Sequence, residues 1–399
     1  MENQTLTTVD QVFDLIDSCI PAPLESEPVP LDQALHRILR EPVRAQEDHP
    51  PFDRSSIDGY LVHEDQPTAP VRVLSTHGAG NPTPATPLVG SAIRIFTGAS
   101  VPPRAALIMQ EDVQTISDKE VKLLKKPNPS LIRRRGGHFL KGETIVPTFS
   151  QLSPGSLGLL ASLGVVRPIV SRLPRIAHLV TGAELVDPAQ SLAEGQIRDV
   201  NSTMIRALLT LCPSDLHFHA RIGDTRKEFL LSIKEALNHT PDLILLSGAS
   251  SVGDQDHSHS TLQELGFRSV VRQVGMRPGK PMILAQRGTT LAFGLPGNPL
   301  SHFVCFHLFV RRALDRLSGR APAELKLAEL PPDVALGIDP RETWWPCRLS
   351  SAGTILTAHP LPWRDSSDLS CLSQTHALLR VPAGRKAGSP VEVLPTIPG

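Results

Sequence analysis

The sequence predicts a multidomain fold that combines a doubly wound α/β domain with two β-rich parts. The chain has 399 residues. This length exceeds that of a domain with one hydrophobic core, so two to four domains are expected. From residue 175 onward, short apolar runs alternate with helical patterns, which is typical of a parallel sheet covered by helices. Over 47–126 and beyond 320, short β-type runs are interrupted by proline and glycine.

The N-terminal part is predicted to be helical, with a small β module inserted into it. Apolar residues follow helical spacing over 9–16 and again over 31–39. The pattern changes to β-type runs such as 71–74 and 121–124, and a helical pattern returns over 157–166. The β module therefore lies between two helical segments of the sequence.

The α/β region alternates strands and helices in a way that predicts where ligands bind. Strands are expected over 175–180, 217–222 and 243–246, and helices over 201–211, 225–237 and 299–317. Asp224 precedes the second helix and is a candidate cap for it. In doubly wound sheets, ligands bind where strand ends meet helix starts.

Composition limits the classes of function. The 40 Lys and Arg residues balance 40 Asp and Glu residues, which argues against a general nucleic-acid or membrane-surface binder. The 5 cysteines form no CxxC or Cys/His cluster, so neither a disulfide framework nor a structural zinc is indicated. No run approaches about 18 apolar residues and no signal-peptide pattern is present, so a cytoplasmic location is expected.

Residues 247–256 form a glycine- and serine-rich turn directly after an apolar strand. Such a turn lets backbone N–H groups approach an anion or a ring, and Asp256 could bind a metal ion or a hydroxyl group. An ordinary strand-to-helix turn with Asp256 as the helix cap has the same pattern. This motif alone leaves both interpretations open.

Two further turns carry candidate anion-binding groups. Arg277 and Lys280 lie three residues apart on a turn stiffened by prolines, which suits an oxyanion, although a solvated basic turn looks the same. Residues 294–301 form a rigid turn before a helix and end with the hydroxyl of Ser301. A tight connection with Pro299 in the first helical turn is the simpler interpretation. No GxxxxGK[ST] motif is present, so P-loop nucleotide binding is not expected.

The β module carries three motifs that are individually unspecific. Residues 52–60 and 94–99 place an acid and a hydroxyl on turns beside glycines, which could complete a polar site. Residues 133–135 are three consecutive arginines, a charge run that is usually a solvated face and sometimes binds phosphate.

The order of these motifs resembles that of the molybdopterin molybdenumtransferase family, which includes bacterial MoeA-type enzymes and the gephyrin E domain. The matching segments are 57–60, 94–99, 132–136, 181–185, 195–201, 251–256, Arg277-Pro278-Gly279-Lys280-Pro281 and Gly294-Leu295-Pro296-Gly297-Asn298-Pro299. The resemblance covers nearly the whole chain, and the last two motifs at this separation are its most specific part.

The resemblance implies a domain plan and a reaction. It implies a helical module (1–46 and 138–172), an inserted β module (47–137), a molybdopterin-binding α/β domain (173–320) and a β-barrel-like C-terminal domain (321–399). It also implies a homodimer that takes adenylated molybdopterin and molybdate, inserts molybdenum and releases AMP with Mg²⁺ assisting. The molybdopterin adenylyltransferase is then a possible partner, and neither nucleic acid nor a membrane is expected.

The resemblance also implies roles for individual residues, which fall into three groups. The functional acids would be Asp58, Glu184, Asp224 and Asp256, with Asp58, Glu184 and Asp256 holding Mg²⁺ or orienting water. The substrate-binding residues would be Thr97, Ser247, Gly248, Ser251, Gly253, Pro278, Gly279, Pro296, Gly297 and Asn298. Molybdate is a tetrahedral dianion that needs cations and hydroxyl donors, and these would be Arg277, Lys280, Ser301, Arg348 and Ser367.

The chain departs from the family pattern at acidic positions. Gly137-His138 stands where Glu-Asp is usual, and Ala183 replaces the acid of a Gly-Asp-Glu triplet. These departures keep a second hypothesis open, a non-catalytic pterin or molybdate carrier or scaffold of the same fold. A third hypothesis, an adenylyltransferase, shares the α/β domain, but the matching β domains argue against it.

Overall fold

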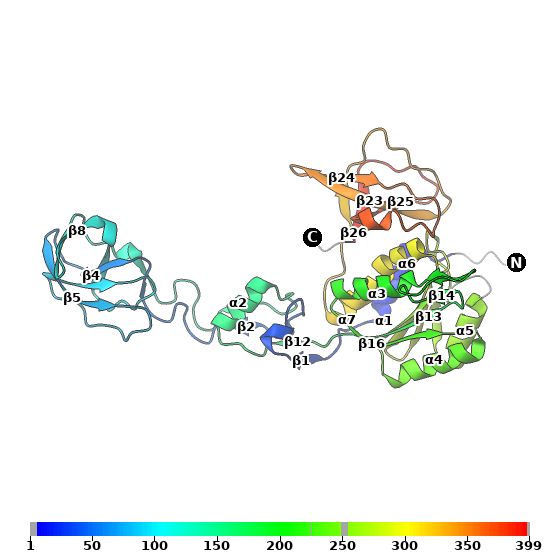
Figure 1. Ribbon diagram of the computed structural model, residues 1–399, viewed down its shortest axis with the longest axis horizontal. Helices are drawn as coiled ribbons and strands as arrows, with labels where there is room; N and C mark the ends of the chain where they lie inside the picture. The colour runs from blue at the N-terminus through cyan, green and yellow to red at the C-terminus, as the bar shows by residue number, and fades with distance from the viewer. Residues whose placement is uncertain (1–5, 224, 249–253, 397–399) are drawn as a thin grey trace. The chain divides into compact units, whose positions relative to one another are not determined.

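The computed structural model describes residues 6–223, 225–248 and 254–396. The chain divides into two compact units. The larger unit comprises Met1–Arg40, Gln151–Ser153 and Arg167–Gly399, and the smaller unit comprises Glu41–Ser150 and Pro154–Val166. Figure 1 shows the α/β sheet and the C-terminal strands of the larger unit and the strands of the smaller one.

The larger unit is built on a six-stranded sheet in the order β16-β13-β17-β21-β20-β18. Its strands are β16 (Asp215–Ile222), β13 (Arg175–Thr181), β17 (Leu243–Ser247), β21 (Thr290–Leu295), β20 (Ile283–Arg287) and β18 (Arg268–Val271). The first four are parallel, as expected, but β20 and β18 are antiparallel to their neighbours. Only residues 288 and 289 connect β20 to β21, and so short a connection joins only antiparallel strands.

Helices cover both faces of this sheet, which confirms the doubly wound fold. One face carries α1 (Val9–Cys19), α3 (Val200–Leu211), α6 (Pro299–Cys305) and α7 (Arg311–Ser318), and the other carries α4 (Arg226–Asn238) and α5 (Asp254–Glu264) (Figure 1). A π-helical segment, Phe306–Val310, joins α6 to α7. Leu243 and Leu245 pack into the first core, whereas Ile244 and Leu246 pack into the second. This alternation along β17 explains why the strand is apolar throughout.

Two local expectations had different outcomes: the helix over 31–39 was wrong, and the cap at Asp224 lies outside the described residues. The helix expected over 31–39 is a 3-10 helix at Leu31–Gln33 only. Ile38 and Leu39 are both buried and form bridges to Gln151 and Val170, so their backbone pairs with extended segments rather than with a helical turn. Helix α4 begins after Thr225, which forms a capping box with Glu228. Asp224, the expected cap, lies outside the described residues.

The C-terminal part of the larger unit is a second sheet, in the order β19-β23-β25-β26-β22, with β24 paired to β23. Its strands are β19 (Met276–Arg277), β22 (Lys326–Ala328), β23 (Glu342–Ala352), β24 (Ile355–Pro360), β25 (Ala377–Val381) and β26 (Val391–Pro395). Because β19 pairs with the start of β23, the turn that carries Arg277 is attached to this sheet. The remaining elements of the larger unit are short: β1 (Ser26–Pro28) with β12 (Ile169–Ser171), β14 (Leu185–Val186) with β15 (Ile197–Arg198), and a 3-10 helix at Leu372–Gln374.

The smaller unit contains a six-stranded sheet in the order β7-β4-β6-β5-β9-β8. Its elements are β2 (Val43–Arg44), β3 (Arg54–Ser55), β4 (Gly59–His63), β5 (Pro70–His77), β6 (Ser91–Ile95), β7 (Ala105–Met109), β8 (Val113–Ser117), β9 (Glu120–Leu123), β10 (Ile132–Arg133), β11 (Thr144–Val146), α2 (Pro154–Ser162) and 3-10 helices at Gln110–Asp112 and Pro129–Leu131. A Cβ at Gly59 would lie 2.0 Å from the carbonyl oxygen of Ile108. The glycine of this motif is therefore required by strand packing.

One buried acid in α7 provides a test of the core. Asp315 is 3% exposed, and burial raises its pKa to about 6, although Arg320 and Arg311 oppose this shift. Since the raised pKa favours the neutral form, the fold loses stability as the pH rises through about 6. We expect Asp315→Asn to raise the free energy of unfolding by about 1–2 kcal/mol at pH 8 and to have little effect at pH 3.5. Thermal denaturation at both pH values measures this, and destabilisation at pH 8 would mean that the Arg320 ion pair outweighs burial.

Candidate functional site

A cleft of about 1170 Å³ opens in the larger unit at the carboxyl ends of its parallel strands. Thr181 ends β13, Gly248 follows β17 and Pro296 follows β21, and all of them line the cleft. The rest of the lining comes from residues 182, 184–185, 192, 197–201, 277–281, 297–299, 301, 341, 363–367 and 369. The cleft therefore lies where a doubly wound sheet places its ligand.

Two glycines let backbone segments approach closely at the cleft. Gly248 has a φ of +89°, and a Cβ there would lie 2.7 Å from the carbonyl oxygen of Thr181. A Cβ on Gly297 would lie 3.5 Å from the Cα of Gly248. The two strand-end turns thus touch through backbone atoms, which leaves room above them for a ligand.

One end of the cleft is cationic. The guanidinium of Arg277 donates from Nη1 to Oδ2 of Asp339 at 3.1 Å, and its Cζ lies 4.9 Å from the centre of the Trp363 ring. Arg341 donates from Nε to the other carboxylate oxygen of Asp339 at 3.3 Å. Burial raises the pKa of Asp339, but hydrogen bonds from Arg341 and Arg277 outweigh it and hold the pKa below its ordinary value. Lys280 also lines this part of the cleft, so positive charge exceeds the charge of Asp339.

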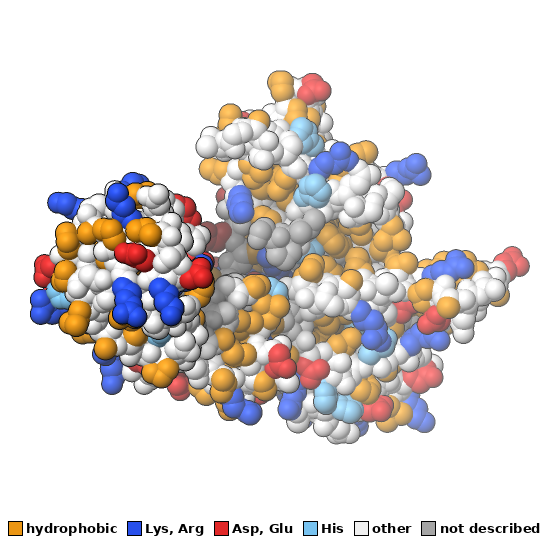
Figure 2. Space-filling view, turned by 60° about the vertical axis from the view of Figure 1, so that its left-hand side comes forward, with side chains coloured by type: hydrophobic (Ala, Val, Ile, Leu, Met, Phe, Trp, Pro, Cys, Tyr) orange, Lys and Arg blue, Asp and Glu red, His pale blue; other side chains and the backbone are white. Residues whose placement is uncertain are grey.

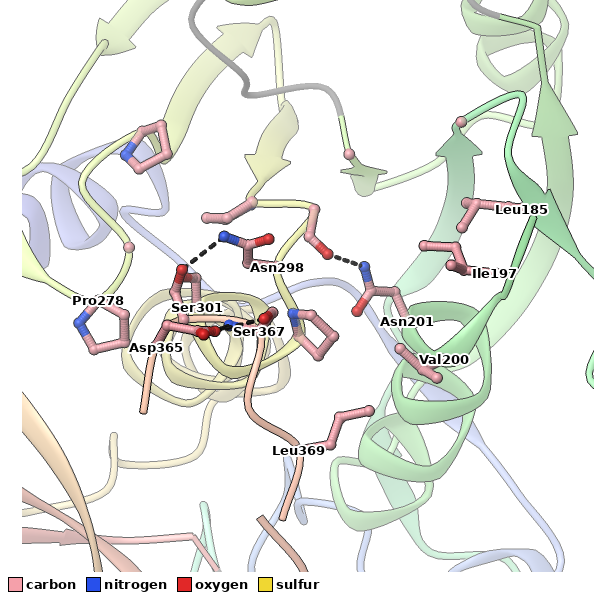
Figure 3. A pocket seen from close by; sticks show the side chains of 18 of the residues that line it. Leu185, Ile197, Val200, Asn201, Pro278, Asn298, Ser301, Asp365, Ser367 and Leu369 are labelled. Carbon is pink, nitrogen blue, oxygen red and sulfur yellow. Dashed lines mark hydrogen bonds between the residues drawn. The ribbon is translucent and has the colours of Figure 1, made fainter. Parts of the chain in front are cut away.

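A loop of the C-terminal part is fastened to the start of α6 beside this cationic end. Asn298 donates from Nδ2 to Oγ of Ser366 at 2.6 Å, and the N–H of Leu300 donates to the carbonyl of Ser366 at 3.1 Å. The N–H of Ser367 donates to Asp365 at 2.8 Å. Figure 3 shows Ser301, Asp365 and Ser367 close together. Two hydroxyl groups from distant parts of the sequence are thus brought into one lining.

The opposite side of the cleft carries a group of apolar side chains. Leu185 and Ile197 come from the paired strands β14 and β15, Val200 begins α3, and Leu369 comes from the C-terminal part (Figure 3). Ile197 is 54% exposed and Leu369 is 43% exposed. Large apolar side chains left exposed inside a cleft are suited to an apolar or planar part of a ligand.

Beneath the cleft lies a buried chain of polar side chains. Ser247 Oγ lies 2.8 Å from Nε2 of His178 and 2.8 Å from Nε2 of His302, and His178 Nδ1 lies 3.1 Å from Nδ1 of His219. Burial holds the pKa of His178 well below its ordinary value and lowers that of His302 to about 3. The chain joins β16, β13 and β17 to α6, and it directly supports Gly248 and Ser301, which line the cleft.

The smaller unit has a separate polar cluster. Asp58 accepts hydrogen bonds from the backbone N–H and from the hydroxyl of Thr97, both at 2.8 Å, and these bonds hold its pKa below the ordinary value. Two arginines of the 133–135 run are ion-paired, Arg134 with Asp53 and Arg135 with Asp48. On the face shown in Figure 2, Lys and Arg side chains are interspersed with Asp and Glu side chains.

The structure brings most of the expected site residues into one cleft. Its lining includes Glu184, Gly248, Arg277, Pro278, Gly279, Lys280, Pro296, Gly297, Asn298, Ser301 and Ser367. Asp58 and Thr97 belong to the smaller unit, and Ser247 lies below the cleft with its hydroxyl between two histidines. Asp224, Ser251 and Gly253 lie outside the described residues, as does the side chain of Asp256, whose backbone is part of α5.

Arg348 and Arg341 differ in their placement. Arg348 is not among the described residues that line the cleft, and its guanidinium donates to Gln374. Arg341, which the sequence analysis did not select, lines the cleft beside Arg277. It immediately precedes β23, whose start pairs with β19. No local sequence signal marks Arg341, because only this strand pairing brings it to Arg277.

Within the described residues, no group of three or more His, Cys, Asp or Glu side chains is arranged to hold a metal ion. Among those residues, no helix has the length and apolar character needed to cross a membrane.

Comparison with known proteins identifies the family. Three family models match: the MoeA N-terminal region (domains I and II) at 7–164, a probable molybdopterin binding domain at 177–316, and the MoeA C-terminal region (domain IV) at 336–396. The molybdopterin molybdenumtransferase of Haemophilus influenzae is 33% identical over 79% of this chain and 78% of its own length. That of Nostoc sp. is 31% identical over 94% of this chain and 89% of its own. The solved structure of a molybdopterin biosynthesis MoeA protein from Pyrococcus horikosii superposes with a TM-score of 0.80 at 26% identity, covering 99% of this chain and 100% of that one. The chain belongs to the molybdopterin molybdenumtransferase family.

Proposed function

We propose that this chain is an enzyme of molybdenum cofactor biosynthesis that inserts molybdenum into adenylated molybdopterin and releases AMP. The observation that carries the proposal is a single cleft with a cationic end and an apolar side, at the carboxyl ends of parallel strands. A cationic end suits molybdate and phosphate, and an apolar side suits a fused ring.

Molybdate binds at the cationic end in this proposal. Arg277 and Lys280 supply positive charge and Ser301 supplies a hydroxyl donor, as the sequence suggested. The hydroxyl of Ser367 donates to Asp365 and would have to exchange this bond for one to the oxyanion. Arg341 takes the place first given to Arg348, because it is Arg341 that lines the cleft. Asp339 fixes the orientation of both guanidinium groups and leaves their remaining N–H donors for the oxyanion.

Mg²⁺ remains part of the proposal. Mg²⁺ sites commonly use one or two carboxylates together with substrate phosphates and water, and Glu184 lines the cleft. Glu184 and Asp256 would hold the ion, which would offset the charge that develops on the phosphate. Asp58 would join them only if the smaller unit of this chain or of a partner supplies it. We also propose that the chain forms a homodimer in the cytoplasm and receives its substrate from the adenylyltransferase.

One of the missing acids has a structural explanation. A Cβ at Gly137 would lie 2.9 Å from the carbonyl oxygen of Arg134. An acidic side chain at this position would therefore require a local shift of the backbone. This observation concerns only the smaller unit, and the acid Glu184 in the cleft is present.

Trp363 provides a test of the cationic end. The indole ring holds the guanidinium of Arg277 by a cation–π contact, which contributes about 0.5–2 kcal/mol. We expect Trp363→Leu to raise the Kd for molybdate about 3- to 10-fold. Isothermal titration with sodium molybdate measures the effect, and an unchanged Kd would show that the indole of Trp363 does not position Arg277.

The function itself is tested by a single turnover of adenylated molybdopterin with Mg²⁺, with and without molybdate. The expected result is AMP release that depends on molybdate, with molybdenum retained on the pterin. The carrier or scaffold hypothesis rests on the missing acids at 137, 138 and 183. Tight pterin binding without AMP release would favour that hypothesis over the enzyme.

A further inference from the structure

Asn201 has a buried acceptor that no described residue satisfies. The residue lies in the first turn of α3, is 7% exposed and lines the cleft. Its Nδ2 donates to the carbonyl oxygen of Gly297 at 2.8 Å. Its Oδ1 is buried and receives no hydrogen bond from any described residue. Figure 3 shows the side chain held at Gly297, between the apolar residues and the turn that ends in Asn298.

The orientation of this amide is fixed by its partner. The carbonyl of Gly297 can only accept, so the amino group of Asn201 must face it and the oxygen must face the other way. A buried acceptor without a donor destabilises a fold by about 1–3 kcal/mol. The side chain lines a cleft, so a ligand that displaces the groups covering this oxygen can supply the missing donor.

The surroundings of Oδ1 indicate what kind of donor it meets. Val200 adjoins Asn201 in the chain, and Leu185, Ile197 and Leu369 form the rest of the apolar side of the cleft. These groups suit the faces of a planar ring, and none of them carries a side-chain donor or acceptor. Arg198 also lines the cleft, but its guanidinium donates to the carbonyls of Pro188 and Gln190. The edge of the ring, such as an amino group on a heteroaromatic ring, is therefore the donor that we consider for Oδ1.

We propose that Asn201 is a specificity residue whose Oδ1 accepts a hydrogen bond from the exocyclic amino group of a fused heteroaromatic ring held on the apolar side of the cleft. The inference rests on the proposed function, since adenylated molybdopterin carries such an amino group on both its adenine and its pterin. Asn201 selects for the amino group because a ring that lacks it would leave Oδ1 buried and unpaired.

The test uses paired probes that differ at the amino group. AMP is compared with purine riboside 5′-monophosphate, and pterin with lumazine, in titrations of the full-length protein. We expect the wild type to prefer the amino-bearing member of one pair by at least about tenfold. The pair that shows the preference identifies whether the adenine or the pterin occupies this place.

Three variants separate recognition from structural support. Asn201→Ala is expected to reduce the preference to less than about threefold. Asn201→Asp, which keeps an acceptor but loses the donor to Gly297, is expected to retain it. Thr203→Ala, an exposed change on the same helix, is the matched control. Because the readout is a ratio between two probes, a variant that only loosens the Gly297 contact would weaken both probes equally.

The outcomes are distinct from those of the turnover experiment. An equal loss for both members of each pair, no preference in the wild type, or no measurable binding of any probe at millimolar concentration would overturn the assignment of Asn201. A clear ring preference without AMP release would leave it standing while the proposed function fails. Molybdate-dependent AMP release without a ring preference would support the proposed function and overturn the assignment of Asn201.

Discussion

Acidification from pH 8 to pH 5 is expected to lower the free energy of unfolding of the larger unit, with on the order of 4 kcal/mol lost through His302 and His307 and a smaller opposing gain from Asp315. Three buried histidines cause this. Burial lowers the pKa of His302 and His307 to about 3 and holds that of His178 well below its ordinary value. All three ionise near pH 6.5 in the unfolded chain, so the unfolded state gains protons at pH 5 that the folded state excludes. Their contribution to stability is complete above pH 6.5 and is lost as the pH falls toward 3, by on the order of 2 kcal/mol each for His302 and His307 at pH 5.

His307 is the best position for testing this effect. Its Nδ1 has no hydrogen-bond partner among the described residues, and its ring packs against Phe303 and Phe306. A cavity of about 30 Å³ next to it leaves room for a slightly larger ring. We expect His307→Phe to reduce the pH dependence of the unfolding free energy by about 1.4 kcal/mol per pH unit between pH 5 and 6.

Urea unfolding followed by tryptophan fluorescence measures this dependence, because the chain's tryptophans, Trp344, Trp345 and Trp363, all lie in the larger unit. At pH 8 the imidazole is neutral in both states, so the variant and the wild type should differ there only through packing. An unchanged slope between pH 5 and 6 would show that His307 is protonated inside the fold, contrary to the prediction.

The alternation of strands and helices in the α/β region was predictable because each element has its own local pattern of apolar and polar residues. The run 243–246 is apolar at every position, and the structure places it in the sheet interior with helices on both faces. The helix predicted over 31–39 was wrong because the structure of this segment depends on distant residues. Its apolar residues have helical spacing, but Ile38 and Leu39 are buried by bridges to distant segments, and such pairing is not visible in local spacing.

The candidate site was predictable where its groups are carried by turns after strands, because the topology of a parallel sheet collects those turns at one edge. Gly248, Pro296 and Gly297 are such residues, since they follow β17 and β21, and they line one cleft. Arg341 was not predictable, because its position depends on the pairing of β23 with β19 across a long stretch of sequence. The hydrogen bond that buries the hydroxyl of Ser247 was not predictable either, since its partner His302 directly follows Ser301, which lines the cleft.

Replacing Arg341 is expected to weaken molybdate binding 10- to 100-fold, because a hydrogen bond between charged groups contributes about 1.5–3 kcal/mol. Arg341 lines the cleft, and its only described acid partner, Asp339, is shared with Arg277. Arg341→Ala removes one cation and lets Asp339 engage Arg277 more fully, so both changes reduce the positive charge offered to the oxyanion.

Arg348→Ala is the matched comparison, since the same residue type is removed seven positions along the chain from a place outside the described lining. Molybdate titrations of the two variants at the same ionic strength, preferably about 0.15 M, decide between the two arginines. A larger loss for Arg348→Ala than for Arg341→Ala would restore the position first inferred from the sequence and would require the C-terminal loop to rearrange when molybdate binds. A larger loss for Arg341→Ala would mean that the pairing of β19 with β23 builds the oxyanion site, with one arginine contributed by each strand's end.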